Sequence, residues 1–145
     1  MKTMKGDLLA LAEQEVFEVI IHGCNCFNHM GAGVAAQIKR KFPEAYKADC
    51  ETKKGDRKKL GTYSFVKLDK LTIINAYTQY RYASNGVHLN YEALRKVFRK
   101  IKNDFSGKRI GYPMIGAGLA GGDWDKIKVI IDEELGDADH TMVYL

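Results

Sequence analysis

The chain has 145 residues, enough for one domain with a sizeable hydrophobic core. Its composition, 46% hydrophobic and 28% charged, is ordinary for a soluble globular protein. The 23 lysines and arginines exceed the 18 acidic residues by five, and this net charge of +5 favours anionic ligands but is too small to indicate nucleic-acid binding by itself. We therefore expect a single domain over residues 1–145.

Neither a targeting segment nor a metal motif is evident in the sequence. Residues 1–14 mix charged and apolar side chains, unlike a signal peptide, and no apolar run approaches the roughly 18 residues that cross a bilayer. We therefore expect a cytoplasmic protein with no membrane contact. The odd number of cysteines (Cys24, Cys26 and Cys50) argues against a disulfide framework, and their spacing does not match a zinc site. We expect three buried or half-buried thiols and no metal.

In the first half of the chain, hydrophobic periodicity predicts alternating strands and helices. The strands are expected at residues 3–9, 16–22, 62–68 and 71–77, the last two forming a hairpin. The strand over residues 16–22 is almost entirely apolar, which is typical of a central strand buried on both faces. A short helical turn or loop is expected over residues 9–15, helices over residues 33–42 and 43–52, and an exposed charged loop over residues 53–59.

In the second half, a polar and aromatic loop over residues 78–89 precedes a helix that Asn90 caps and Ser106-Gly107 ends. A short strand follows over residues 109–114, then a helix capped by Asp123, and a closing strand over residues 140–145. This order predicts an α/β fold: a three-layer α/β/α sandwich with a mixed central sheet, because the hairpin interrupts an otherwise parallel arrangement.

Two glycine-rich stretches, residues 22–35 and 113–122, each follow an apolar β-branched run and precede a helical pattern. Such an arrangement points backbone N–H groups and the positive end of a helix toward an anion. In a parallel sheet, ligands bind beyond the carboxyl ends of the strands, where both stretches are expected. Neither is a Walker A motif or a clean dinucleotide fingerprint. Together they predict two loops that face one phosphate-bearing ligand from two sides.

Five polar residues near these stretches each allow a structural and a functional interpretation. Asp7 is a turn or cap residue or a ligand contact, and Asp123 is most simply a helix cap. His22 ends a buried strand, so it is either a hydrogen-bonded core residue or a general acid or base whose pKa is near neutrality. Asn25 caps a loop or contacts a ribose hydroxyl, and His29 is expected to be exposed and incidental.

Three motifs stand out in the sequence: Gly6-Asp7-Leu8-Leu9, then His22-Gly23-Cys24-Asn25 with Met30-Gly31-Ala32-Gly33-Val34-Ala35, and Pro113-Met114-Ile115-Gly116-Ala117-Gly118-Leu119. Taken together they resemble the macro domain family, and the resemblance covers nearly the whole chain. The similar subgroup comprises small macro domains that are ADP-ribose 1″-phosphate phosphatases or terminal ADP-ribose glycohydrolases.

The resemblance implies an ADP-ribose site. In it, Asp7 accepts a hydrogen bond from the adenine amino group, Leu8 and Leu145 lie near the adenine, and Asn25 holds the distal ribose. The first stretch would wrap the distal ribose and one phosphate, and the second would wrap the diphosphate. The residues implied are Met30, Gly31, Ala32, Gly33 and Val34 in the first stretch, and Met114, Ile115, Gly116, Ala117, Gly118, Leu119 and Ala120 in the second.

Two departures from the family pattern bear on the reaction. The glycohydrolase branch has a nucleophilic lysine where this chain has Gln79, and an acidic residue where it has Ala120, so that route is not expected. The pattern over residues 21–26 resembles the phosphatase branch instead. The leading hypothesis is a phosphatase acting on ADP-ribose 1″-phosphate, with His22 as the acid or base and no cofactor. The alternatives are a non-catalytic ADP-ribose reader and an O-acetyl-ADP-ribose deacetylase.

A third class of function, nucleic-acid binding, is the weaker rival. It would use the basic run over residues 53–59 and the aromatic residues between Tyr77 and Tyr82. We expect the protein to be a monomer that binds ADP-ribose or its 1″-phosphate.

Overall fold

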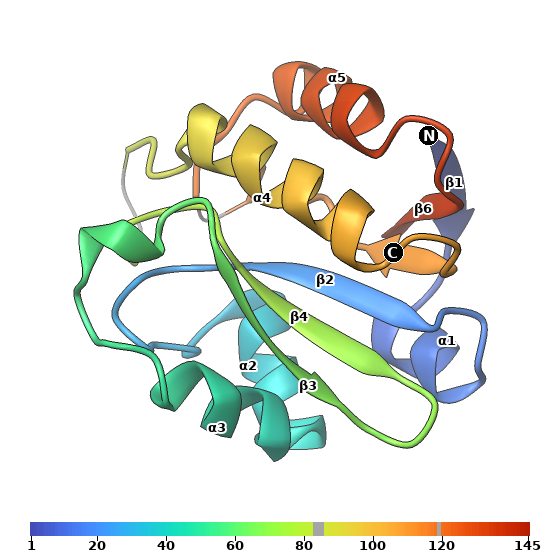
Figure 1. Ribbon diagram of the computed structural model, residues 1–145, viewed down its shortest axis with the longest axis horizontal. Coiled ribbons are helices and arrows are strands. Elements are labelled where there is room, and N and C mark those ends of the chain that lie inside the picture. Colours follow the sequence, from blue (N-terminus) through green and yellow to red (C-terminus); the bar gives the residue numbers. More distant parts are fainter. Residues whose placement is uncertain (83–85, 119) are drawn as a thin grey trace.

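The computed structural model describes residues 1–82, 86–118 and 120–145 and contains a six-stranded sheet (Figure 1). The strands lie in the order β1-β6-β5-β2-β4-β3, and all neighbouring pairs are parallel except the antiparallel pair β3 and β4. The mixed sheet and its hairpin are therefore confirmed. The strands are β1 (Lys2–Lys5), β2 (Val19–Cys24), β3 (Tyr63–Lys67), β4 (Thr72–Tyr77), β5 (Ile110–Tyr112) and β6 (His140–Tyr144).

Helices cover both faces of this sheet, which confirms the three-layer α/β/α sandwich (Figure 1). One layer contains α1 (Leu8–Glu13), α2 (Gly33–Lys41) and α3 (Pro43–Cys50), and the other contains α4 (Tyr91–Asp104) and α5 (Trp124–Leu135). The caps of α4 and α5 are the expected ones: Asn90 accepts a hydrogen bond from the Ala93 amide, and Asp123 accepts one from the Asp125 amide.

The central strand β2 is buried on both faces and lies between β4 and β5. Ile20 faces the layer of α1, α2 and α3, whereas Val19 and Ile21 face α4 and α5. The carboxyl end of β2 leads into the first glycine loop (residues 25–32), and the carboxyl end of β5 leads into the second (residues 113–122). Because β2 and β5 are adjacent and parallel, the two loops leave the same edge of the sheet side by side.

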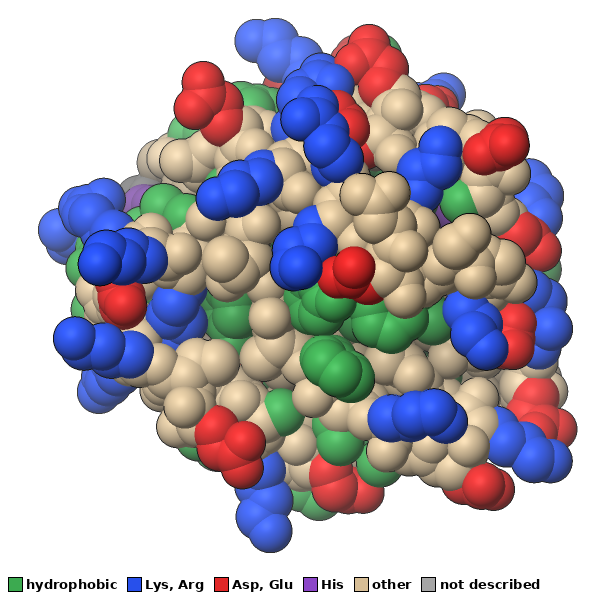
Figure 2. All heavy atoms as spheres, viewed as in Figure 1, with side chains coloured by type: hydrophobic (Ala, Val, Ile, Leu, Met, Phe, Trp, Pro, Cys, Tyr) green, Lys and Arg blue, Asp and Glu red, His purple; other side chains and the backbone are tan. Residues whose placement is uncertain are grey.

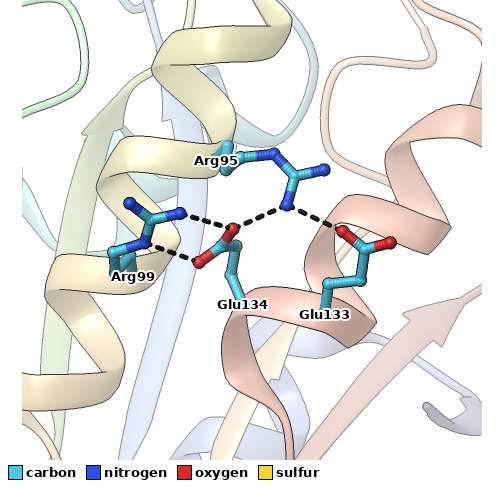
Figure 3. A network of polar contacts seen from close by, with 4 residues as sticks. All are labelled: Arg95, Arg99, Glu133 and Glu134. Carbon is cyan, nitrogen blue, oxygen red and sulfur yellow. Dashed lines mark hydrogen bonds and ion pairs between the residues drawn. The ribbon is translucent and has the colours of Figure 1, made fainter.

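An ion-pair network joins α4 to α5, the helix that follows the second glycine loop (Figure 3). Glu134 accepts hydrogen bonds from Arg95 Nη1 at 2.7 Å and from Arg99 Nε at 2.9 Å. Arg95 also bonds Glu133 at 2.7 Å. Hydrogen bonds from Arg99 are the main cause of the lowered pKa of Glu134, so the carboxylate stays charged and ties the two helices together.

Three local expectations are corrected by the structure. The expected strand over residues 3–9 ends at Lys5, because Asp7 caps α1 by accepting hydrogen bonds from the Leu9 and Ala10 amides. Cys50 is exposed, whereas Cys24 and Cys26 are buried as expected. Lys59 was expected in an exposed loop, but it is buried at the end of a 3₁₀ turn (Arg57–Lys59).

The surface of the molecule carries both hydrophobic and charged side chains. Figure 2 shows hydrophobic side chains gathered near the middle of one face, with lysines and arginines spread around its edge. On the outer strand β3, Phe65 is half-exposed and packs edge-on against Tyr63 and Phe105. Within the described residues, no helix has both the length and the apolar character that a membrane span requires.

Candidate functional site

The two glycine loops line the same cavity, which has a volume of about 360 Å³. Loop residues, the end of β2 and the segment after β4 all contribute to its wall. The lining residues are His22, Gly23, Cys24, Asn25, His29, Gly31, Ala32, Gly33, Val34, Ala35, Gln79, Tyr82, Pro113, Met114, Ile115, Gly116, Gly118 and Ala120. Two stretches that are about 90 residues apart in sequence are thus brought together, as the glycine pattern predicts.

Several residues of the predicted site lie outside this cavity. Met30 is buried beneath the first loop, where it packs in one cluster with Cys24, Cys26 and Tyr77. Ala117 is half-buried in the second loop and packs against the core on the side of α4 and α5. Leu119 falls outside the described residues.

The residues predicted for the adenine lie together at another place. Asp7 lines a neighbouring hollow of about 350 Å³ with Leu9, Gln37, Arg40 and Lys41. Leu8 is buried in the first turn of α1, and Leu145, which follows β6, is 93% exposed. A hydrogen bond of 2.7 Å from the Gly6 amide to the Tyr144 carbonyl oxygen holds this end of the chain beside Asp7. Their roles in binding remain predictions.

Asn25 organises the first glycine loop from within. Its Oδ1 accepts hydrogen bonds from the amides of Phe27 at 2.9 Å and His29 at 3.4 Å, and its Nδ2 donates to the His29 carbonyl oxygen at 2.7 Å. The loop-capping interpretation of Asn25 is therefore confirmed. Nδ2 carries a second hydrogen, so the side chain also has a donor left for a ligand in the cavity that it lines.

The side chain of a buried lysine, Lys59, is hydrogen-bonded to the same loop. Lys59 Nζ donates to Asn28 Oδ1 at 2.8 Å and to the Cys26 carbonyl oxygen at 3.1 Å, and it lies 4.7 Å from the centre of the Tyr77 ring. Asn28 has a left-handed backbone with φ of 56°, and its side chain also bonds Thr52. These contacts hold the turn that places the rest of the loop at the cavity.

His22 lies in a buried polar network between β2 and β4. Asn75 Nδ2 donates to the Ala45 carbonyl oxygen and to Ser64 Oγ, both at 3.0 Å, so its Oδ1 must accept from His22 Nε2 at 2.6 Å. The Cys24 Sγ lies beside the same ring, 3.5 Å from Nε2 and 3.7 Å from Nδ1.

The burial of His22 contradicts the expectation that its pKa is near neutrality. The residue is only 1% exposed although it belongs to the cavity lining. Burial lowers the pKa of His22 to about 4, and the hydrogen bond from His22 to Asn75 offsets this only in part. The prediction of a pKa near neutrality is therefore wrong, and the imidazole is neutral at neutral pH.

The second glycine loop is held mainly by main-chain hydrogen bonds, both within the loop and from the amides of residues 88–89 to the Ala120 carbonyl oxygen. The Gly122 amide donates to the Gly116 carbonyl oxygen at 2.7 Å, and the Gly121 amide donates to the Gly118 carbonyl oxygen at 3.0 Å. Gly116 has φ of +77°, which favours glycine, and a Cβ there would lie 2.8 Å from Leu89 Cδ1. Glycine is therefore needed for both the conformation and the packing of this turn.

Two aromatic side chains lie at the mouth of the cavity. His29 comes from the first glycine loop and Tyr82 from the segment after β4, and their rings stack with centroids 4.1 Å apart and planes 24° apart. Both residues are exposed and both line the cavity. The exposure expected for His29 is correct, but the expectation that it is incidental is not supported. Its position two residues before Gly31 is the sequence signal that could have placed it at the site.

The described lining contains few groups with strong acid–base chemistry. Gln79 and Ala120 both line the cavity. They stand at the positions where the resemblance places a lysine and an acidic residue in the glycohydrolase branch. In residues 1–82, 86–118 and 120–145, neither aspartate nor glutamate lines this cavity, and no three metal-ligating side chains form a cluster. This part of the wall therefore offers mainly backbone and small apolar groups to a ligand.

Comparisons with known proteins agree with this geometry. The family model described as Macro domain matches residues 21–131. A 17.5 kDa protein from the tk-vs intergenic region of Enterobacteria phage T4 is 38% identical over 90% of this chain and 87% of its own length. An ADP-ribose 1″-phosphate phosphatase of Candida albicans is 27% identical over 90% of each chain.

The fold is also found among solved structures. A macrodomain of Thermus aquaticus DarG superimposes with a TM-score of 0.77 at 25% identity, over 99% of this chain and 97% of that one. A Bacteroides thetaiotaomicron protein of unknown function superimposes with a TM-score of 0.80 at 26% identity, over 99% and 97%.

Proposed function

This chain belongs to the macro domain family, and on that premise we propose that it binds ADP-ribose in the cavity between the two glycine loops and hydrolyses ADP-ribose 1″-phosphate. The observation that carries the proposal is the meeting of both loops at one cavity beside the ends of β2 and β5. The reaction is supported by fungal relatives named ADP-ribose 1″-phosphate phosphatase, at 23% to 27% identity over nine-tenths of this chain or more.

In this proposal the diphosphate is held by main-chain groups. Residues of both loops and the first residues of α2 line the cavity, and their backbone N–H groups would provide donors and a positive potential for phosphate oxygens. Asn25 uses its remaining amide hydrogen on the distal ribose. Asp7 uses one carboxylate oxygen to cap α1, and the other accepts the adenine amino group.

Hydrolysis then requires a water molecule to attack the 1″-phosphorus while the sugar oxygen leaves. Amides of the first glycine loop stabilise the phosphoryl oxygens, whose charge increases in the transition state. His22 contributes by holding the end of β2 in place, because its ring is buried and bonded to Asn75 on the adjacent strand β4. The predicted acid–base role of His22 is therefore the part of the proposal with the least structural support.

A specific observation favours a second candidate, a non-catalytic reader of ADP-ribose. Among the described residues, no carboxylate lines the cavity, and carboxylates are common proton acceptors in hydrolysis. A reader would need only the two loops and the adenine contacts predicted for Asp7, Leu8 and Leu145, and no acid or base.

Calorimetry and a phosphate assay together test these alternatives. We expect ADP-ribose to bind, AMP to bind more weakly because it lacks the diphosphate and the distal ribose, and inorganic phosphate to be released from ADP-ribose 1″-phosphate. Binding without phosphate release would establish the reader. Absence of binding at millimolar ADP-ribose would overturn both.

A further inference from the structure

We infer that His29, stacked on Tyr82 at the mouth of the cavity, is the catalytic acid of the hydrolysis proposed above. The inference depends on that proposed function and assigns its proton donor. The proton donor is then the exposed His29 and not the buried His22, which lies at the end of the strand before the same loop. Four observations support it: the position of the ring, the support of the backbone around it, the stacking partner, and the exclusion of the other titratable side chains.

The ring of His29 lies directly against the backbone of the first glycine loop. A Cβ on Gly31 would lie 2.5 Å from His29 Nε2, a distance that real Cβ atoms do not reach, so only glycine leaves room for the imidazole in this position. The neighbouring residues Ala32 and Gly33 also line the cavity. The imidazole is therefore next to the amides that would hold the phosphoryl oxygens of the substrate.

The main chain on either side of this imidazole is fixed before any ligand arrives. Asn25 bonds both the amide and the carbonyl oxygen of His29, and the left-handed Asn28 that precedes it is tied to Lys59 and Thr52. A catalytic group placed by such supporting contacts does not lose conformational freedom in each reaction cycle.

Tyr82 fixes the plane of the ring from outside the loop. Its side chain comes from the segment after β4 and stacks on the imidazole at 4.1 Å. The same tyrosine meets Phe27 edge-on at 6.2 Å, so it bridges two residues of the first loop.

The other titratable groups in the described lining are less suitable. His22 is 1% exposed and its Nε2 is bonded to Asn75, and burial raises the pKa of the Cys24 thiol well above its ordinary value. Imidazole is the side chain that exchanges protons most readily near neutral pH. Of the histidines that line the cavity, His29 is the exposed one.

The step is balanced without any further reactant. The oxygen of a water molecule forms a bond to the 1″-phosphorus while the bond from phosphorus to the sugar oxygen O1″ breaks. Protonated His29 donates its proton to O1″, which leaves as the hydroxyl of ADP-ribose. The attacking water loses a proton to solvent, and solvent reprotonates the imidazole, so that the products are ADP-ribose and inorganic phosphate.

The test compares His29→Gln with the wild-type protein and with His88→Gln, which changes a histidine outside the cavity lining. We expect His29→Gln to lower kcat for phosphate release by about 10²- to 10⁴-fold and to remove the alkaline fall of kcat that reports a catalytic acid. The Kd for ADP-ribose, measured by calorimetry, is expected to change less than about threefold, since main-chain groups hold the diphosphate. His88→Gln should keep the wild-type pH profile.

Each other outcome has a definite meaning. If His29→Gln releases phosphate at the wild-type rate with the same pH profile, His29 is not the acid, and the proposed phosphatase function stands without it. If the wild-type protein binds ADP-ribose but releases no phosphate, the hydrolysis and the role of His29 are both overturned. A fall in kcat with a matching loss of ADP-ribose binding would assign His29 to binding and also overturn its role as the acid.

Discussion

The two glycine loops reach the same cavity but are held in place by different means. The first is held by side chains: Asn25 bonds it from within, and Lys59 and Thr52 bond it from a distant part of the chain. The second is held by main-chain hydrogen bonds, such as the one within the loop from Gly122 to Gly116 and the one from the His88 amide to Ala120. The first loop should therefore respond to side-chain changes far from the ligand, and the second mainly to changes at its glycines.

The largest effect is expected from Lys59→Met, which removes the buried cation beneath the first loop. We expect the free energy of unfolding to fall by about 3 kcal/mol, because two hydrogen bonds from a charged donor are lost. The Kd for ADP-ribose should rise about tenfold as the turn at Asn28 loosens. Urea unfolding and calorimetry measure the two changes.

Lys58→Met is the matched control, since Lys58 is the exposed neighbour of Lys59. Its free energy of unfolding should stay within about 0.5 kcal/mol of the wild-type value. If the two variants are equally stable, the first loop does not depend on the buried lysine, and the contrast between the loops is lost.

A smaller effect is expected from Gly116→Ala in the second loop. The left-handed backbone costs an alanine about 1 kcal/mol, and moving Leu89 away from the new Cβ costs about 1 kcal/mol more. The free energy of unfolding should therefore fall by about 2 kcal/mol. Gly118→Ala is the control, because a Cβ there meets nothing within 4 Å, and its melting temperature should be unchanged. Equal melting temperatures for both alanine variants would contradict the argument.

The smallest effect is expected in the pH dependence of stability, through the buried His22 and its hydrogen bond to Asn75. The pKa of His22 is about 4 in the folded protein and about 6.5 in the unfolded chain, so between these values the unfolded chain binds more protons. Stability should fall as pH falls through this window, by at most about 1.4 kcal/mol between about pH 6 and pH 5. The lowered pKa of His140 acts in the same direction, and the raised pKa of Asp49 acts in the opposite one.

Denaturant unfolding of His22→Gln at several pH values isolates the contribution of His22 to the pH dependence of stability. The glutamine amide can still donate to Asn75, and the slope of stability against pH should become shallower. His29→Gln is the reference, because its ring is exposed, and it should keep the wild-type slope. An unchanged slope in His22→Gln would mean that His22 is not a buried neutral histidine.

Much of the fold could be predicted because its signals are local. Residues 16–22 contain the apolar run of a central strand, Asn90 and Asp123 are helix caps, and glycines follow β2 and β5. The boundary at residues 3–9 was wrong because a cap at Asp7 competes with the apolar pattern that follows it.

The sequence by itself determined the order of strands and helices, the mixed sheet and the presence of two glycine turns, since each depends on residues close together in the chain. Only the tertiary structure decided that the exposed histidine lines the cavity and stacks on Tyr82, and that one lysine of a charged run is buried beneath a loop. These outcomes depend on the pairing of β2 with β4 and on the packing of residues 52–59 against residues 26–28. Contacts between segments so far apart determine burial, and burial determines which groups can exchange protons with a ligand.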